Sequence, residues 1–213
     1  MFAKDFKKQA RDCLNGKWGT AILVYVIHMV IAMGCSAIPV VGSFAALIIG
    51  GPLVLGLTFV FIQFVRGGTP EVGDMFWGFK ANFLESFLLQ LINSVFIFLW
   101  SLLFIIPGIV KAYSYAMSFY ILADNPGISQ SEARKASVAM MQGNRWRLFC
   151  LELSFIGWMI LGMFTFGILY IWLVPYMQAA YAAFYEDLKA KNAPAVEQAP
   201  STDEPATCNP EIA

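Results

Sequence analysis

Short polar stretches and long apolar blocks alternate along the chain, and the sequence passes through this alternation three times. The first polar stretch covers residues 2–15. It places Phe2, Phe6 and Ala10 on one side of a helix and the lysines mostly on the other. This spacing predicts a basic amphipathic helix that lies on a surface.

The second polar stretch follows residue 66 and is shorter. Apolar side chains recur at i, i+3, i+4 and i+7 over residues 72–79, which predicts one apolar stripe on a short surface helix. Thr69 is the expected N-cap, and Pro70 is expected at the first helical position, where its missing N–H costs nothing. Gly78 lies near the expected end of this helix.

The third polar stretch, residues 125–149, is the longest. Ser129 followed by Glu132 forms a capping box, which predicts a helix start. Gly143 occupies the position of a left-handed stop residue. We expect this helix to lie on the membrane surface next to a spanning helix.

Each predicted surface helix ends at a glycine, and aromatic or cationic residues follow each of these glycines. Aromatic and cationic side chains favour the membrane interface, so we expect this structural motif to mark where a span begins. Its members are Gly16, Trp18, Gly78, Gly143, Arg145, Trp146 and Arg147.

Six apolar blocks follow these surface helices in pairs, and several of them reach the roughly 20 residues needed to cross a membrane. Glycine and proline residues divide the blocks within each pair. The expected spans cover about residues 20–38, 44–65, 83–104, 108–123, 148–166 and 168–185. The predicted fold is therefore all-α, a polytopic membrane helical bundle with six spans.

The three passes predict three pseudo-repeats, each an amphipathic surface helix plus two transmembrane helices. Their boundaries are about 2–65, 66–124 and 125–188, within a membrane domain of residues 1–188. The alternative is that this order of elements is common in membrane proteins and marks no true repeat. Residues 189–213 are rich in Pro, Ala and acidic residues, which predicts a disordered cytoplasmic tail.

Composition excludes an ordinary soluble domain. Hydrophobic residues make up 59% of the chain and charged residues only 13%, whereas soluble domains carry about 25% charged residues. The mean hydropathy is +0.65. The four cysteines are widely spaced and contain no C-x-x-C pair, so neither a disulfide framework nor a zinc site is expected.

The cations determine the expected topology. With six spans and both termini on one side, that side carries 13 of the 14 Lys and Arg residues, and Lys111 alone lies toward the other side. Cytoplasmic loops of membrane proteins are enriched in Lys and Arg, so both termini are predicted to be cytoplasmic.

Four segments resemble the domain-of-unknown-function 975 family of bacterial integral membrane proteins. They read ARDCLNGKWGTAILV, YAMSFYILADNPGISQSEARKAS, M-x-G-N-x-W-R-L-F and LVPYMQAAYAAFYEDL. The resemblance covers nearly all of residues 1–188 and implies a multi-pass protein of the bacterial cell (plasma) membrane. It implies no catalytic residue, and the Pro/Ala-rich tail departs from the family.

Polar residues at membrane depth are the candidates for chemistry. Glu85 and Glu152 occur in matching contexts, so they either form a proton- or cation-binding pair or each pair with a nearby cation at the interface. His28 is the only histidine, and Gln90 and Asn93 lie in the third span. These three either hydrogen-bond between helices or line a path.

No phosphate-binding loop, H-E-x-x-H or G-x-S-x-G motif occurs, so no enzyme, cofactor or metal is expected. Two classes of function remain. One is a non-enzymatic protein that organises membrane lipids, anionic headgroups above all, or a membrane protein partner or second copy. The other is a small transporter or channel-like permease with Glu85 and Glu152 on its path. The basic helices fit lipid headgroups better than nucleic acid.

Overall fold

The computed structural model describes residues 3–36, 41–103, 105–165 and 167–192, and all regular structure within these ranges is helical. The all-α prediction is confirmed. The helices are α1 (Ala3–Leu14), α2 (Trp18–Ser36), α3 (Val41–Val65), the 3₁₀ helix η1 (Val72–Phe76), α4 (Trp77–Ala81), α5 (Phe83–Leu103), α6 (Ile105–Tyr115), α7 (Ser118–Asp124), α8 (Gln130–Met140), α9 (Arg145–Phe164) and α10 (Tyr170–Asn192).

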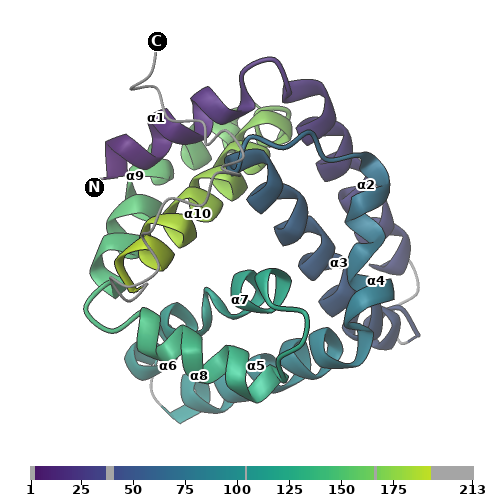
Figure 1. Cartoon of the computed structure of the whole chain (residues 1–213), viewed down its shortest axis with the longest axis vertical. Helices are drawn as coiled ribbons and strands as arrows, with labels where there is room; N and C mark the ends of the chain where they lie inside the picture. Colours follow the sequence, from purple (N-terminus) through teal and green to yellow (C-terminus); the bar gives the residue numbers. More distant parts are fainter. Residues whose placement is uncertain (1–2, 37–40, 104, 166, 193–213) are drawn as a thin grey trace, which may run out of the picture.

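Helix α1 begins the fold as the amphipathic helix that the spacing predicts. Phe6, Ala10 and Leu14 are buried on its apolar face, which packs on α10 and also contacts α9 and α3. Gly16 adopts a φ of 77° and ends the helix, since a side chain is strained in this conformation. Helix α2 then leaves at 100° to α1 (Figure 1).

Helix α3 is the central helix of the molecule. It contacts α2, α5, α7 and α10, and also η1 and α4. Its apolar segment Ile48–Val65 is 67% buried inside the protein, compared with 17% for Phe83–Trp100 of α5 and 22% for α9. A helix that is apolar on all sides needs such an environment.

Glycines allow η1 and α4 to approach α3 closely. A Cβ atom at Gly56 would lie 1.7 Å from the backbone oxygen of Met75, and one at Gly78 would lie 2.2 Å from that of Pro52. The prediction that Gly78 ends a helix is therefore wrong. Gly78 lies inside α4, and it is glycine because the α3 backbone leaves no room for a side chain.

Two further predictions in the second unit are wrong. The N-cap of η1 is Glu71, with Asp74 completing a capping box, so Thr69 and Pro70 precede the helix. Pro107 is the third residue of α6 and lies in a helix rather than a turn between helices. This position suits proline because N–H groups in a first helical turn have no partner within the helix.

The predicted fourth span is not one continuous helix. It divides into α6 and α7, which are separated by a turn at Ala116 and Met117. Helix α7 is buried along most of its length against α3 and α8. The chain therefore bends inward here, and Figure 1 shows α7 inside the ring formed by the outer helices.

The third unit follows the prediction most closely. Ser129 and Glu132 form both hydrogen bonds of the capping box at the start of α8, which confirms that prediction. Gly143 has a φ of 75° and Gly167 a φ of 84°, so both expected breaks are present. Helix α10 continues to Asn192, four residues beyond the predicted domain boundary, and the rest of the expected tail lies outside the described residues.

Three described helices are long and apolar enough to cross a membrane, namely α3, α5 and α9. A fourth candidate arises if the bent pair α1 and α2 is counted as one span. The other expected spans differ in form, because α6 and α7 are separate short helices and the last turns of α10 carry Glu186, Asp187 and two lysines.

In α2, α5 and α9 the buried side chains lie in the first part of the helix, beside exposed ones such as Leu23 and Leu84, and the second part is apolar and largely exposed. Buried residues near their starts include Val24, Leu89 and Leu151. The second parts, residues 29–34, 95–102 and 156–164, are called here the apolar arms. The most exposed large side chains of the arms are Met33 (66%), Leu102 (74%) and Phe164 (79%). We call the rest of the described molecule the packed end.

Candidate functional site

The ends of three inner helices are joined by ion pairs centred on Asp124. Arg66 follows α3, and its Nη2 lies 2.6 Å from Asp124 Oδ1 and 2.8 Å from Glu186 Oε1. Lys189 Nζ of α10 lies 2.6 Å from Asp124 Oδ2. Tyr185 also donates a hydrogen bond to this carboxylate, at 3.1 Å. These contacts fasten α7 to α3 and α10.

The environment of Asp124 keeps its carboxylate ionised. Burial alone raises the pKa of a carboxyl group, but hydrogen bonds from Lys189 and Arg66 and their charges outweigh this effect, so the pKa of Asp124 is lowered. The side chain of Asp124 is only 7% exposed. A buried carboxylate with two cationic partners and a tyrosine is a structural clamp, since every partner stabilises the charged form.

Arg147 is a second clamp, at the start of α9. Its Nη2 lies 2.8 Å from Asp187 Oδ2, and its Nη1 donates to Asn144 Oδ1 at 3.0 Å. The guanidinium also stands 5.5 Å from the ring centre of Phe184 and 5.7 Å from that of Phe6. Arg147 therefore binds α1, α9 and α10 together and faces the protein, whereas we expected it to face the membrane interface.

The other residues of the predicted motif divide between surface and interior. Trp146 is 71% exposed and packs on Phe149, as an interfacial tryptophan would. The Nε atom of Arg145 is buried and finds no hydrogen-bond partner in the described part of the chain. Trp18 packs on Tyr176 of α10, with ring centres 6.4 Å apart.

Glu85 caps a neighbouring helix. Its Oε2 accepts a hydrogen bond from the backbone N–H of Gln130, the first residue of α8, at 2.5 Å. The first N–H groups of a helix have no partner within the helix, and a carboxylate there also interacts favourably with the helix dipole. Glu85 thus links α5 to α8.

Glu152 has tyrosine partners instead of a cation. Tyr113 of α6 donates a hydrogen bond to Glu152 Oε2, and Tyr181 of α10 donates one to Oε1 at 3.4 Å. Glu85 and Glu152 share no hydrogen-bond partner among the described residues. The structure therefore gives each carboxylate its own set of neighbours.

The remaining candidate residues do not gather around either carboxylate. His28 lies on α2 and its Nδ1 atom is buried, while Gln90 and Asn93 lie one turn apart on α5. No hydrogen bond joins His28 to these amides within the described ranges, and the Oδ1 atom of Asn93 is also without a partner there. Nor do the described ranges contain three His, Cys, Asp or Glu residues placed to hold a metal ion.

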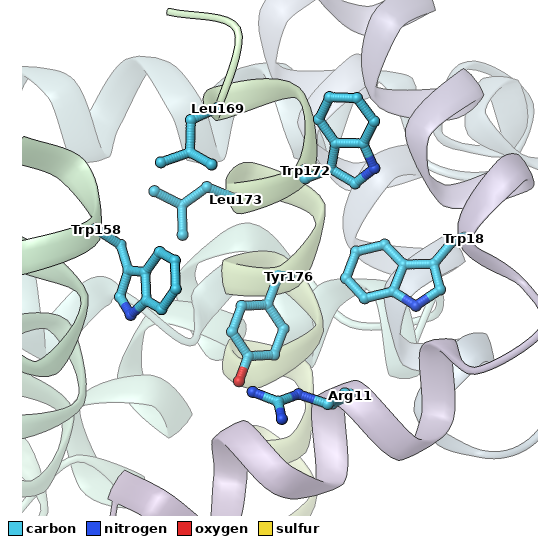
Figure 2. A pocket seen from close by; sticks show the side chains of 7 residues that line it. All are labelled: Arg11, Trp18, Trp158, Leu169, Trp172, Leu173 and Tyr176. Atoms are coloured by element: carbon cyan, nitrogen blue, oxygen red, sulfur yellow. The ribbon is translucent and has the colours of Figure 1, made fainter. Parts of the chain in front are cut away.

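A groove between α1, α9, α10 and the start of α2 has both charged and aromatic walls. One part, of about 180 Å³, is lined by Trp18, Trp158, Trp172, Leu169, Leu173, Tyr176 and Arg11. Figure 2 shows Trp158 and Trp18 on opposite sides of Tyr176, with the Arg11 guanidinium next to the Tyr176 hydroxyl. An adjoining part, of about 270 Å³, is lined by Lys4, Lys7, Lys8, Arg11, Trp158 and Tyr176.

Sequence reasoning did not identify the residues of the Asp124 clamp, and of the groove residues its predicted motif included only Trp18. Arg66 directly follows α3 and Asp124 ends α7, so their similar positions after two apolar blocks were an available signal. Trp158 and Trp172 lie within apolar blocks, where a tryptophan in a groove has the same pattern as one that faces lipid. Only the packing of α1 across α9 and α10 distinguishes these roles.

Comparison with known proteins adds one finding. The family model described as "Protein of unknown function (DUF975)" matches residues 1–115 and 103–192. No significant match is found among curated proteins, and none among solved structures. The two matched segments cover all described residues, and the chain belongs to the DUF975 family.

Proposed function

We propose that this protein is a multi-pass protein of the bacterial cell membrane, with both termini in the cytoplasm, that organises lipids or partner proteins and is not an enzyme. The observation that carries the proposal is the contrast between the packed end and the apolar arms. Arms on three separate helices expose large apolar side chains, among them Met33, Leu102 and Phe164. In a bilayer, lipid chains would cover these side chains.

The distribution of charge supports this placement. Charged side chains are absent from the sequences of the three arms, and the ion pairs of Asp124 and Asp187 lie at the packed end. Lys111 of α6 is the cation found next to an arm, since its ammonium stands 5.3 Å from the ring centre of Trp100 in α5. The packed end would therefore be the cytoplasmic end, because Lys and Arg are concentrated there.

The contacts between helices support three repeated units and six spans. The short helices at the start of each unit pack on the last helix of another unit. Helix α1 packs on α10, η1 and α4 pack on α3, and α8 packs on α7. Under this proposal α6 and α7 together form one broken span, and α2 and α10 are spans as well. Broken helices occur in membrane proteins where neighbouring protein satisfies the backbone.

The clamp residues also occupy matching places in the three units. Each clamp residue lies four positions after a buried side chain in the sequence. The pairs are Ile62 and Arg66, Tyr120 and Asp124, and Tyr185 and Lys189. Contacts between equivalent residues of the three units support a ring arrangement. In this arrangement the units surround the inner helices α3, α7 and α10.

The permease alternative receives less support. It requires Glu85 and Glu152 to line one path, but Glu85 caps α8 and Glu152 accepts hydrogen bonds from Tyr113 and Tyr181. Each of these contacts has a structural purpose, so no observation here favours a conducting path.

Fusions to a protein that fluoresces only in the cytoplasm test the topology. Fusions after Gly68 and after Asn192 should fluoresce, and one near Pro107 should remain dark. A dark fusion after Asn192, with a fluorescent N-terminal fusion, would place the termini on opposite sides and refute the six-span arrangement.

A further inference from the structure

The groove between α1, α9 and α10 changes in character along its length. One part is lined by three tryptophans, two leucines and Tyr176, and the adjoining part is lined by the four cations of α1. Arg11, Trp158 and Tyr176 line both parts, so the two form one continuous groove. Cationic at one end and aromatic at the other, it is complementary to an amphiphile with an anionic head.

The cationic part combines fixed and mobile donors. Lys7 Nζ donates to the backbone oxygen of Ser154 at 2.6 Å and stands 4.2 Å from the ring centre of Phe155. Tyr176 donates to the backbone oxygen of Lys7 at 2.9 Å, which holds α1 against α10. Lys4 and Lys8 are exposed, so their flexible chains can follow an anion.

The aromatic part opens toward the region that the proposal assigns to lipid. Trp158 is 52% exposed and belongs to the apolar arm of α9, while Trp172 is 51% exposed on α10. Tryptophan favours the membrane interface, where one end of its ring system is apolar and the other is polar. An acyl chain that leaves the groove past Trp158 would continue along the arm into the bilayer.

We infer that this groove binds one anionic phospholipid of the surrounding bilayer. Its phosphodiester lies at Lys4, Lys8 and Arg11, and one acyl chain lies along Trp158 and Trp172. The inference rests on the proposed function, because it requires the arms to be in the membrane. The two cavity volumes together fall in the range of about 300–1,000 Å³ typical of small-molecule sites.

Tryptophan quenching tests the inference on the full chain purified in an uncharged detergent. Phosphatidylglycerol and phosphatidylcholine with the same brominated acyl chains are titrated separately, since bromine quenches a tryptophan in contact with the chain. Phosphatidylglycerol should bind about tenfold more tightly, because two or three cations near a membrane phosphate contribute additively.

Matched double variants locate the site. Lys4→Gln with Lys8→Gln should remove the preference for phosphatidylglycerol. Lys80→Gln with Lys135→Gln removes the same charge from exposed positions on α4 and α8 that do not line the groove, and should retain the preference. Trp158→Phe should reduce the quenchable fluorescence in both lipids. Circular dichroism and the elution volume show whether each variant is folded.

Three outcomes would overturn the inference. If phosphatidylglycerol and phosphatidylcholine bound with equal affinity, the cations would have no role in selecting the lipid. Equal loss of preference in both double variants would indicate diffuse electrostatics rather than a site. Displacement of the lipid by millimolar inorganic phosphate would indicate an anion site that does not need the acyl chain. The topology fusions are unaffected by any of these results, so failure of the site and failure of the proposed function are distinguishable.

Discussion

The two parts of α9 both contain large apolar side chains, but these side chains lie in different surroundings. In the part that precedes the arm, Leu148, Leu151 and Phe155 are buried against other helices. In the arm, Ile160 and Phe164 are exposed, although they are just as apolar. In α2 and α5 the buried side chains likewise precede the arm, although Leu23 and Leu84 there are exposed.

This difference shows that each of these helices contacts the protein core along only part of its length. Buried side chains at the packed end contact protein on all sides and are accompanied by ion pairs and helix caps. Side chains of the arms require another apolar environment, which we assign to lipid. Substitutions should therefore be costly at the packed end and nearly neutral in the arms, and the predictions below test this in order of expected effect.

The largest effect is expected at the crossing of α3 and η1. Gly56→Ala would place a Cβ atom 1.7 Å from the backbone oxygen of Met75, and backbone cannot move aside as a side chain can. The free energy of unfolding should fall by about 3 kcal/mol or more. Thermal unfolding in detergent measures it.

Gly50→Ala is the matched control in the same helix, because a Cβ atom there meets nothing within 4 Å. It should be neutral or slightly stabilising, by up to about 1 kcal/mol, as alanine favours the helix. Equal behaviour of the two variants would mean that η1 does not pack closely on α3.

The Asp124 clamp should have the next largest effect. Asp124→Asn removes the partner of Arg66 and Lys189 and should cost about 3 kcal/mol at neutral pH, the lower end for a broken buried pair because both cations are partly exposed. Asp12→Asn on the exposed side of α1 should cost little. A similar small effect at both positions would contradict the clamp.

The same variant should change the pH dependence of stability. Because the pKa of Asp124 is lowered in the folded protein, its contribution is complete above the unfolded value of about 3.9 and is lost as the pH falls through the lower folded value. The wild type should lose stability below about pH 4, and the decline should be shallower in Asp124→Asn. If the stability of the wild type and of Asp124→Asn fell with the same slope as the pH is lowered, this prediction would be refuted.

A smaller effect is expected where α8 ends. Gly143→Ala should destabilise by about 1 kcal/mol, because a side chain at a φ of 75° is strained even though space is available. Gly127→Ala also meets open space but has no such φ, so its free energy of unfolding should hardly change. Equal costs would mean that the left-handed stop does not matter.

The smallest effect is expected in an arm. Leu99→Ala in α5 should change stability in detergent by less than about 0.5 kcal/mol, since this side chain is 58% exposed. Leu89→Ala in the same helix should cost about 2–5 kcal/mol because Leu89 is fully buried. If Leu99→Ala proved as costly as Leu89→Ala, the arm would be packed against protein.

Local signals in the sequence predicted much of this fold. The capping box of Ser129 and Glu132 and the left-handed Gly16 and Gly143 are set by nearby residues, so they could be predicted without the structure. Gly78 could not, because its role depends on Pro52, which lies in another helix, α3. The same glycine pattern is compatible with a helix stop and with a close crossing.

The candidate site was less predictable. Glu85 and Glu152 were recognised as unusual at their depth, but their partners Gln130, Tyr113 and Tyr181 come from other helices. Hydropathy shows that a residue is apolar and cannot show whether protein or lipid covers it. That distinction requires the tertiary arrangement of the helices.

Spin labels in reconstituted bilayers test the central claim most directly. Labels at Met33, Leu102 and Phe164, one in each arm, should collide often with oxygen and rarely with a water-soluble nickel chelate. A label at the exposed Lys135 of α8 should show the reverse. The account would be contradicted if the three arm labels were as accessible to the nickel chelate as the label at Lys135.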